Sequence, residues 1–132
     1  MRNKIKLSTT LAASPEQIYV AWLNSKQHTA FTGAKATATK RKGGSFTAWD
    51  GYISGKNLEL ENNKKIVQQW RSTDFPKQAE DSMLEVVLEK SGKGTKLTLI
   101  HSNIPEGQAE SYKKGWKDFY FNPMKKYFSA EK

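Results

Sequence analysis

The first residues of the chain alternate between apolar and polar side chains from Ile5 to Leu11. A period of two places Ile5, Leu7 and Leu11 on the same side of an extended backbone, with Lys6 between the first two. The pattern predicts a first β-strand with one buried face.

The period changes to that of a helix after Ser14. The Ser14 hydroxyl can cap the first turn, Pro15 occupies a position where no amide partner is needed, and Gln17 can complete a capping box. Apolar residues then recur at the spacing i, i+3 and i+4, so that they share one face that can lie on a sheet. They are Ile18, Ala21 and Trp22.

A second short helix is predicted over Lys26 to Phe31. Gly33 follows it and can provide a left-handed cap at its C-terminal end. Because the residues of this helix are mostly polar, we expect His28 to be exposed.

The middle of the chain is divided by turn signals into short segments of strand character. The signals are Gly43-Gly44, Asp50-Gly51, residues 61–64 and residues 91–94. The implied strands are 34–41, 44–50, 52–60, 65–72, 82–90 and 95–102, and their regular spacing predicts an antiparallel meander. Phe75-Pro76 interrupts the meander, so that residues 73–81 are predicted to form a polar loop at the rim of any cavity. Trp49 falls on the face opposite Phe46 and Ala48, and we expect it on the outer face of the sheet under the first helix.

The last part of the chain, from about Glu106, has a helical stripe of aromatic residues. Pro123 lies inside this stripe, where it lacks the amide that would bond to the carbonyl of Phe119 and crowds that carbonyl. We therefore expect a kink or break between a first part at about 107–121 and a second, more basic part.

Size and composition narrow the possibilities. The 132 residues fit one domain, residues 1–132. Without cysteine there is neither a disulfide nor a thiolate nucleophile, and two histidines do not make an ordinary zinc site, so we expect neither a metal nor a cofactor. No run approaches the roughly 20 apolar residues that span a bilayer. Polar residues also interrupt the N-terminal stretch that superficially looks like a secretory signal, and a cytoplasmic location is therefore expected.

Several motifs together resemble the Activator of Hsp90 ATPase homolog 1-like family from about Lys4 to the C-terminus. They are residues 11–22, Gly44-Ser45-Phe46, residues 50–55, residues 65–71, residues 94–99 and Gly115-Trp116. The resemblance implies an α+β helix-grip fold of the START-like (SRPBCC, Bet v 1-like) superfamily, with a curved antiparallel sheet around a long C-terminal helix, in the order β-α-α-β6-α.

Three further motifs, Phe31-Thr32, residues 42–46 and residues 116–121, look closest to the C-terminal domain of the eukaryotic co-chaperone. The sequence has no counterpart of that protein's N-terminal domain, and only feeble stimulation of a chaperone ATPase is therefore expected.

In this superfamily the space between sheet and helix is the usual ligand site. The alternation of the strands and the aromatic stripe provide its candidate lining. The alternative is that these side chains simply fill the core. The candidates are Phe46, Ala48, Gln68, Trp70, Leu84, Val86, Leu88, Leu97, Leu99, His101, Trp116, Phe119 and Tyr120. Gln68 and His101 favour a pocket, because inward polar groups need partners or water.

His101 is the one candidate acid or base, since an ordinary histidine titrates near neutral pH. No nucleophile, base and orienting group accompany it in the sequence, so a purely structural role is the alternative. A cyclase- or hydrolase-like enzyme of the wider superfamily is therefore a third interpretation, after a ligand-binding domain and a co-chaperone.

Basic residues exceed acidic ones by 22 to 13, which gives a formal net charge of +9. Such a surplus attracts acidic partners or simply keeps the surface solvated. The candidates for contact with an acidic chaperone are Lys113, Lys114 and Lys117. Nucleic acid is not expected as a partner, because Trp22, Trp70 and Trp116 fall at positions predicted to be buried rather than available for stacking.

Overall fold

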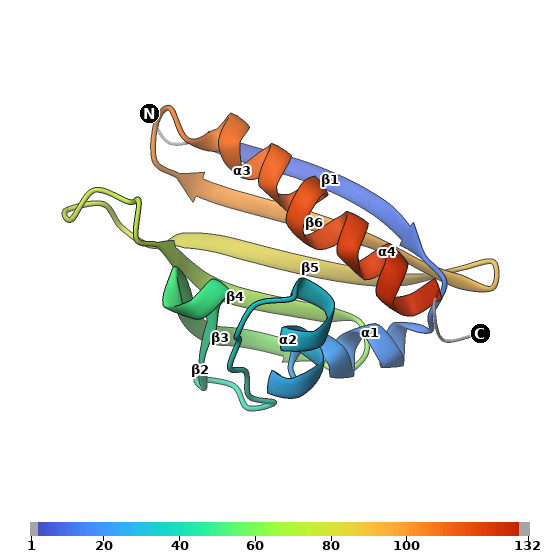
Figure 1. Ribbon diagram of the computed structural model, residues 1–132. Coiled ribbons are helices and arrows are strands. Elements are labelled where there is room, and N and C mark those ends of the chain that lie inside the picture. The colour runs from blue at the N-terminus through green and yellow to red at the C-terminus, as the bar shows by residue number, and fades with distance from the viewer. Residues whose placement is uncertain (1–2, 130–132) are drawn as a thin grey trace.

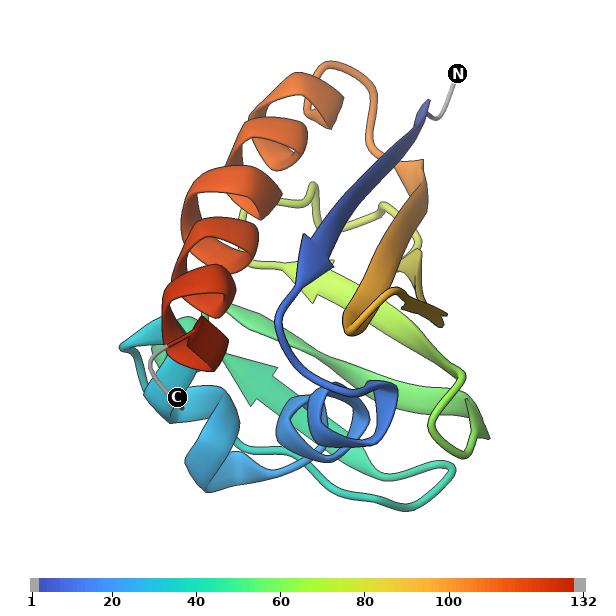
Figure 2. The same ribbon diagram turned by 90° about the vertical axis from the view of Figure 1, so that its right-hand side faces the viewer.

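A six-stranded antiparallel sheet and one long C-terminal helix lie face to face in the computed structural model, which describes residues 3–129 (Figures 1 and 2). The first half contains β1 (Asn3–Leu11), α1 (Pro15–Trp22), α2 (Ser25–Thr32), β2 (Ser45–Ala48) and a 3₁₀ turn, η1 (Trp49–Gly51). The second half contains β3 (Ile53–Glu61), β4 (Lys65–Ser72), β5 (Ser82–Ser91), β6 (Gly94–Ile104), α3 (Ala109–Trp116), a π turn, η2 (Lys117–Phe121), and α4 (Asn122–Ser129).

The strands follow the order β1-β6-β5-β4-β3-β2, so the chain runs as a meander from β2 to β6 and closes against β1. A row of apolar residues crosses four of them: Leu7 lies opposite Leu99, Leu99 opposite Val86, and Val86 opposite Ile66. All four are buried. The α+β helix-grip fold is therefore confirmed, and the alternating pattern correctly identified the face that the helix covers.

The predicted strand at 34–41 is wrong, so five strands rather than six follow the first two helices. Only Thr37 pairs with a strand, through an isolated bridge to Thr47. Elsewhere in this segment, side chains form hydrogen bonds with backbone groups that would otherwise pair with a neighbouring strand. The Ser25 hydroxyl donates to the carbonyl of Ala38, and the Asn57 side-chain amide donates to the carbonyl of Arg41. Such side-chain bonds satisfy these backbone groups without a neighbouring strand.

The start of α1 and the end of α2 are as the sequence predicts. Ser14 Oγ accepts from the amide of Gln17 (3.1 Å), and the Gln17 side chain accepts from the amide of Ser14 (2.8 Å), which is the full capping box. Gly33 ends α2 with φ of 83°, the left-handed conformation that glycine adopts without steric cost.

The C-terminal helix does not break at Pro123. Instead the turn before it widens: the amide of Asn122 donates to the carbonyl of Lys117, five residues back, within the π turn η2. The expected two-part division falls at this turn, but the helix continues through α4 to Ser129 (Figure 1). A π turn accommodates the proline because it changes the i to i−4 pairing that the pyrrolidine ring would block.

Among residues 3–129, none of the helices is both long enough and apolar enough to cross a bilayer.

Candidate functional site

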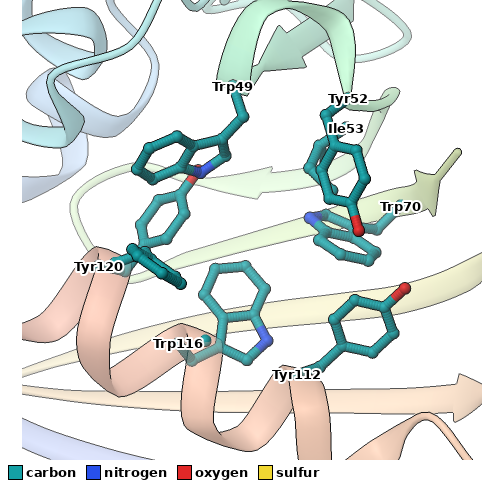
Figure 3. A pocket seen from close by; sticks show the side chains of 9 residues that line it. Trp49, Tyr52, Ile53, Trp70, Tyr112, Trp116 and Tyr120 are labelled. Carbon is teal, nitrogen blue, oxygen red and sulfur yellow. The ribbon is translucent and has the colours of Figure 1, made fainter. Parts of the chain in front are cut away.

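An apolar cavity of about 240 Å³ lies between the C-terminal helix and the end of the sheet formed by β3 and β4. Its walls come from the 3₁₀ turn η1, from β3 and β4, and from α3 with the π turn (Figure 3). It reaches solvent beside Phe119 and Tyr52, whose side chains are 57% and 39% exposed. The lining residues are Trp49, Tyr52, Ile53, Trp70, Tyr112, Gly115, Trp116, Phe119 and Tyr120.

Aromatic rings pack against one another on both sides of the cavity. On the helix side, the ring centroids of Trp116 and Tyr120 are 4.7 Å apart. On the sheet side, Trp70 lies 5.7 Å from Trp116 and 5.3 Å from Tyr112. Such contacts hold the walls at fixed positions, since edge-on and tilted ring pairs are favourable.

Trp49 does not lie on the outer face of the sheet under the first helix, as the sequence pattern predicted. The strand ends at Ala48, and the next three residues, Trp49, Asp50 and Gly51, have φ of 54°, 58° and 92°. This left-handed run turns the indole toward the cavity, where it contacts Phe119 at 5.6 Å between ring centroids. A left-handed conformation costs a residue with a side chain about 1 kcal/mol or more, and such strain gathers at functional sites.

Four of the predicted lining residues, Trp70, Trp116, Phe119 and Tyr120, line this cavity. The other candidates are buried in the core instead. They are Phe46, Ala48, Gln68, Leu84, Val86, Leu88, Leu97, Leu99 and His101.

Sequence reasoning did not select Trp49, Tyr52, Ile53, Tyr112 or Gly115 for the lining. Two of them carried a usable signal, because Tyr112 precedes Trp116 by four residues and Gly115 precedes Phe119 by four. Residues at that spacing are neighbours on a helix.

Burial of His101 is stabilised by a continuous chain of hydrogen bonds behind the cavity. The Trp116 indole donates to His101 Nδ1 (3.1 Å), and the Ser82 hydroxyl donates to the carbonyl of Trp70 (2.7 Å). His101 Nε2, 2.8 Å from Ser82 Oγ, must then be the protonated nitrogen of a neutral ring. Burial lowers the pKa of His101 to about 3.

His28 is buried, contrary to the expectation that it is exposed. Its Nδ1 lies 2.9 Å from the carbonyl of Trp22, which can only accept, so Nδ1 carries the proton. The Tyr120 hydroxyl therefore donates to His28 Nε2 (2.9 Å). Burial lowers the pKa of His28 to about 4, although the bond to the Trp22 carbonyl acts in the opposite direction.

Gln68 also has its hydrogen bonds within the protein. Its side-chain oxygen accepts from the Trp22 indole (3.3 Å), and its amide donates to Asn57 Oδ1 (2.9 Å). Asn57 in turn donates to the carbonyls of Thr39 and Arg41, both at 3.0 Å. The network ties α1 to β4, β3 and the 34–44 segment.

The mouth of the cavity carries tyrosine hydroxyls that donate outward. The Tyr52 hydroxyl donates to Asp74 Oδ2, in the loop between β4 and β5, and the Tyr112 hydroxyl donates to Gln108 Oε1 (2.9 Å). Burial raises the pKa of Tyr52, and its contact with the Asp74 carboxylate raises it further.

The predicted contact lysines Lys113, Lys114 and Lys117 are all exposed on α3 and the π turn. Lys114 forms an ion pair with Asp118 (3.6 Å) across one helical turn. Within residues 3–129, no three His, Asp or Glu side chains come together as metal ligands.

The model of the family "Activator of Hsp90 ATPase homolog 1-like protein" matches residues 12–129. Activator of 90 kDa heat shock protein ATPase homolog 1 of Homo sapiens is 33% identical over 125 residues, and the Mus musculus protein of that name is 30% identical. The match covers 95% of this chain but only 37% of either relative's length.

Solved structures agree with the fold. An HSP90 activator from Plasmodium falciparum superposes with a TM-score of 0.82 at 26% identity, covering 90% of this chain and 91% of that one. The structure of an Aha1 dimer from Colwellia psychrerythraea superposes with a TM-score of 0.78 at 19% identity, covering 92% and 93%.

Proposed function

The chain belongs to the Activator of Hsp90 ATPase homolog 1-like family, and we propose on that premise that it is a non-enzymatic domain that binds an Hsp90-type chaperone. The names of its curated relatives, activators of the ATPase of the 90 kDa heat shock protein, support this partner. Because the chain spans 37% of the length of those relatives, binding is proposed here and stimulation of the ATPase is not.

The observation that carries the proposal is the cluster of exposed lysines on α3 and the π turn, Lys113, Lys114 and Lys117. Clustered positive charge suits a partner with an acidic surface. The net charge of +9 speeds the encounter with such a surface.

The surroundings of His28 and His101 support the non-enzymatic part of the proposal. Both are neutral and buried, and both ring nitrogens of each are committed to groups of the protein. A general base needs a pKa near the working pH, whereas these values lie near 3 and 4.

Titration of the labelled domain with a purified Hsp90-type chaperone tests the binding. We expect amide shift changes along α3, and weaker binding at about 0.15 M salt than at low ionic strength, since charge interactions are screened over about 8 Å there. The double variant Lys113→Glu/Lys117→Glu should weaken binding about fivefold or more, because repulsion replaces attraction.

Lys90→Glu/Lys93→Glu is the matched control. It reverses the same number of exposed charges at the hairpin between β5 and β6, at the other end of the sheet from the start of α3 (Figure 1). It should leave the affinity nearly unchanged. Equal losses in both variants would show non-specific attraction, and the absence of any shift change at either salt concentration would remove the chaperone proposal.

A second function, binding of a small apolar ligand, is favoured by the aromatic cavity itself. A volume of about 240 Å³ is below the roughly 300–1,000 Å³ of drug-sized sites, so the ligand would be small. Titration with a panel of lipids, flavonoids and aromatic acids should shift the signals of the lining residues Trp49 and Trp116. If none of these compounds perturbs the lining signals, the cavity is not a ligand site for these classes.

A further inference from the structure

One polar group of the cavity has no hydrogen-bond partner within the part of the chain that the structure describes. The Trp70 side chain is only 4% exposed, yet among the described residues 3–129 nothing accepts a hydrogen bond from its indole N–H. Every fully buried polar side-chain atom of the described residues has a hydrogen-bond partner. Because the Trp70 N–H has none, it cannot be fully buried and must border open space. Figure 3 shows the Trp70 nitrogen on the edge of the ring that faces the cavity, toward Trp49 and Tyr120.

The other donors around the cavity are already in use. The Trp116 indole donates to His101, and the Trp49 indole N–H faces the Tyr120 hydroxyl oxygen (Figure 3). The tyrosine hydroxyls donate away from the cavity, from Tyr52 to Asp74, from Tyr112 to Gln108 and from Tyr120 to His28. The cavity therefore offers an entering molecule one strong donor on an otherwise aromatic surface.

We propose that this cavity binds an uncharged, flat, largely apolar molecule with one hydrogen-bond acceptor, such as a ring-fused ketone, and that Trp70 Nε1 donates to that acceptor. The inference rests on the ligand-binding function proposed above and makes Trp70 the residue that sets specificity. A cavity of about 150 Å³ is enough for benzene, so about 240 Å³ suits a fused two-ring molecule.

Charged ligands fit this surface less well. An anion would exchange its hydration for one neutral donor, which leaves most of its charge unsolvated. A cation could lie on the ring faces, which attract positive charge. It would, however, meet the positive end of the Trp70 N–H bond and the field of a chain with a net charge of +9.

The test compares 1-indanone with indane, two fused-ring molecules of nearly the same shape that differ in one carbonyl oxygen. We expect 1-indanone to bind about fivefold to tenfold more tightly, as one added neutral hydrogen bond commonly gives. In the intact protein, 1-indanone should also move the Trp70 indole proton signal downfield and slow its exchange with water, and indane should not.

Trp70→Phe removes the N–H and keeps an aromatic ring, so it should abolish the preference for 1-indanone while indane binds about as before. Trp49→Phe is the matched control, since it trims the same cavity but removes an N–H that faces the Tyr120 hydroxyl. This control should retain the preference. Thermal melts of both variants establish that they are folded.

The outcomes separate the inference from the function on which it rests. Equal affinity for the two probes, or a preference that survives Trp70→Phe, would overturn the role of Trp70 but leave an apolar ligand site. The same conclusion follows if the wild-type Trp70 proton does not respond to bound 1-indanone. Failure of both probes to bind at millimolar concentration would overturn the proposed ring-fused ligand class as well.

Discussion

At the scale of single residues, the two histidines show how buried polar groups hold one protonation state. An added proton on His101 would point Nδ1–H at the Trp116 N–H, so that two donors would face each other. An added proton on His28 would displace the hydrogen bond from the Tyr120 hydroxyl. Burial opposes the charge in both cases and lowers both pKa values.

The protein should lose stability in mild acid for this reason. In the unfolded chain both histidines take up protons near pH 6.5, whereas the folded pKa values are about 4 for His28 and about 3 for His101. Protonation therefore favours unfolding, so the contribution is fully present above pH 6.5 and is lost as the pH falls toward the folded values. At pH 5 the loss should be about 2 kcal/mol for each histidine, measured by urea titration at pH 7.5 and pH 5.

His101→Gln separates this effect from that of the carboxylates. The variant will be less stable at every pH, but its loss between pH 7.5 and pH 5 should be smaller than that of the wild type by about 2 kcal/mol. An unchanged loss would mean that His101 already titrates normally in the folded protein.

At the scale of elements, the π turn η2 reconciles Pro123 with a continuous helix. It also sets the cavity wall, because Phe119 and Tyr120 belong to this turn and line the cavity with Gly115 and Trp116 of the preceding turn. The irregularity and the site thus occupy the same few residues, as is common for π turns.

Because the π turn already accommodates the proline, Pro123→Ala should change the free energy of unfolding by less than about 1 kcal/mol, well short of the roughly 3 kcal/mol typical of a proline that blocks an α-helix. Denaturant titration measures the change. Lys114→Pro, placed in α3 where no widened turn precedes it, provides the contrast and should cost about 3 kcal/mol or more. A stabilisation of similar size by Pro123→Ala would show that the proline strains the helix.

At the scale of the whole molecule, the fold was more predictable than the site. Three features could be predicted because each depends only on residues that are neighbours in the sequence. They are the alternation along β1, the capping box at Ser14 and the left-handed cap at Gly33. The cavity depends on where the helix parts from the sheet and on the left-handed turn at Trp49, which strand periodicity cannot represent. Inward-facing Gln68 and His101 looked like pocket groups, yet distant partners, Asn57 and Ser82 among them, occupy their polar atoms.

Three of the four tryptophans stand in a row through the molecule, with ring centroids 6.4 Å apart from Trp22 to Trp116 and 5.7 Å from Trp116 to Trp70. Indoles this close exchange excitation energy before they emit, so light absorbed by Trp22 in α1 is emitted in part from the rings at the cavity. The intrinsic fluorescence of the protein is consequently a built-in optical reporter of that cavity, which needs no attached dye.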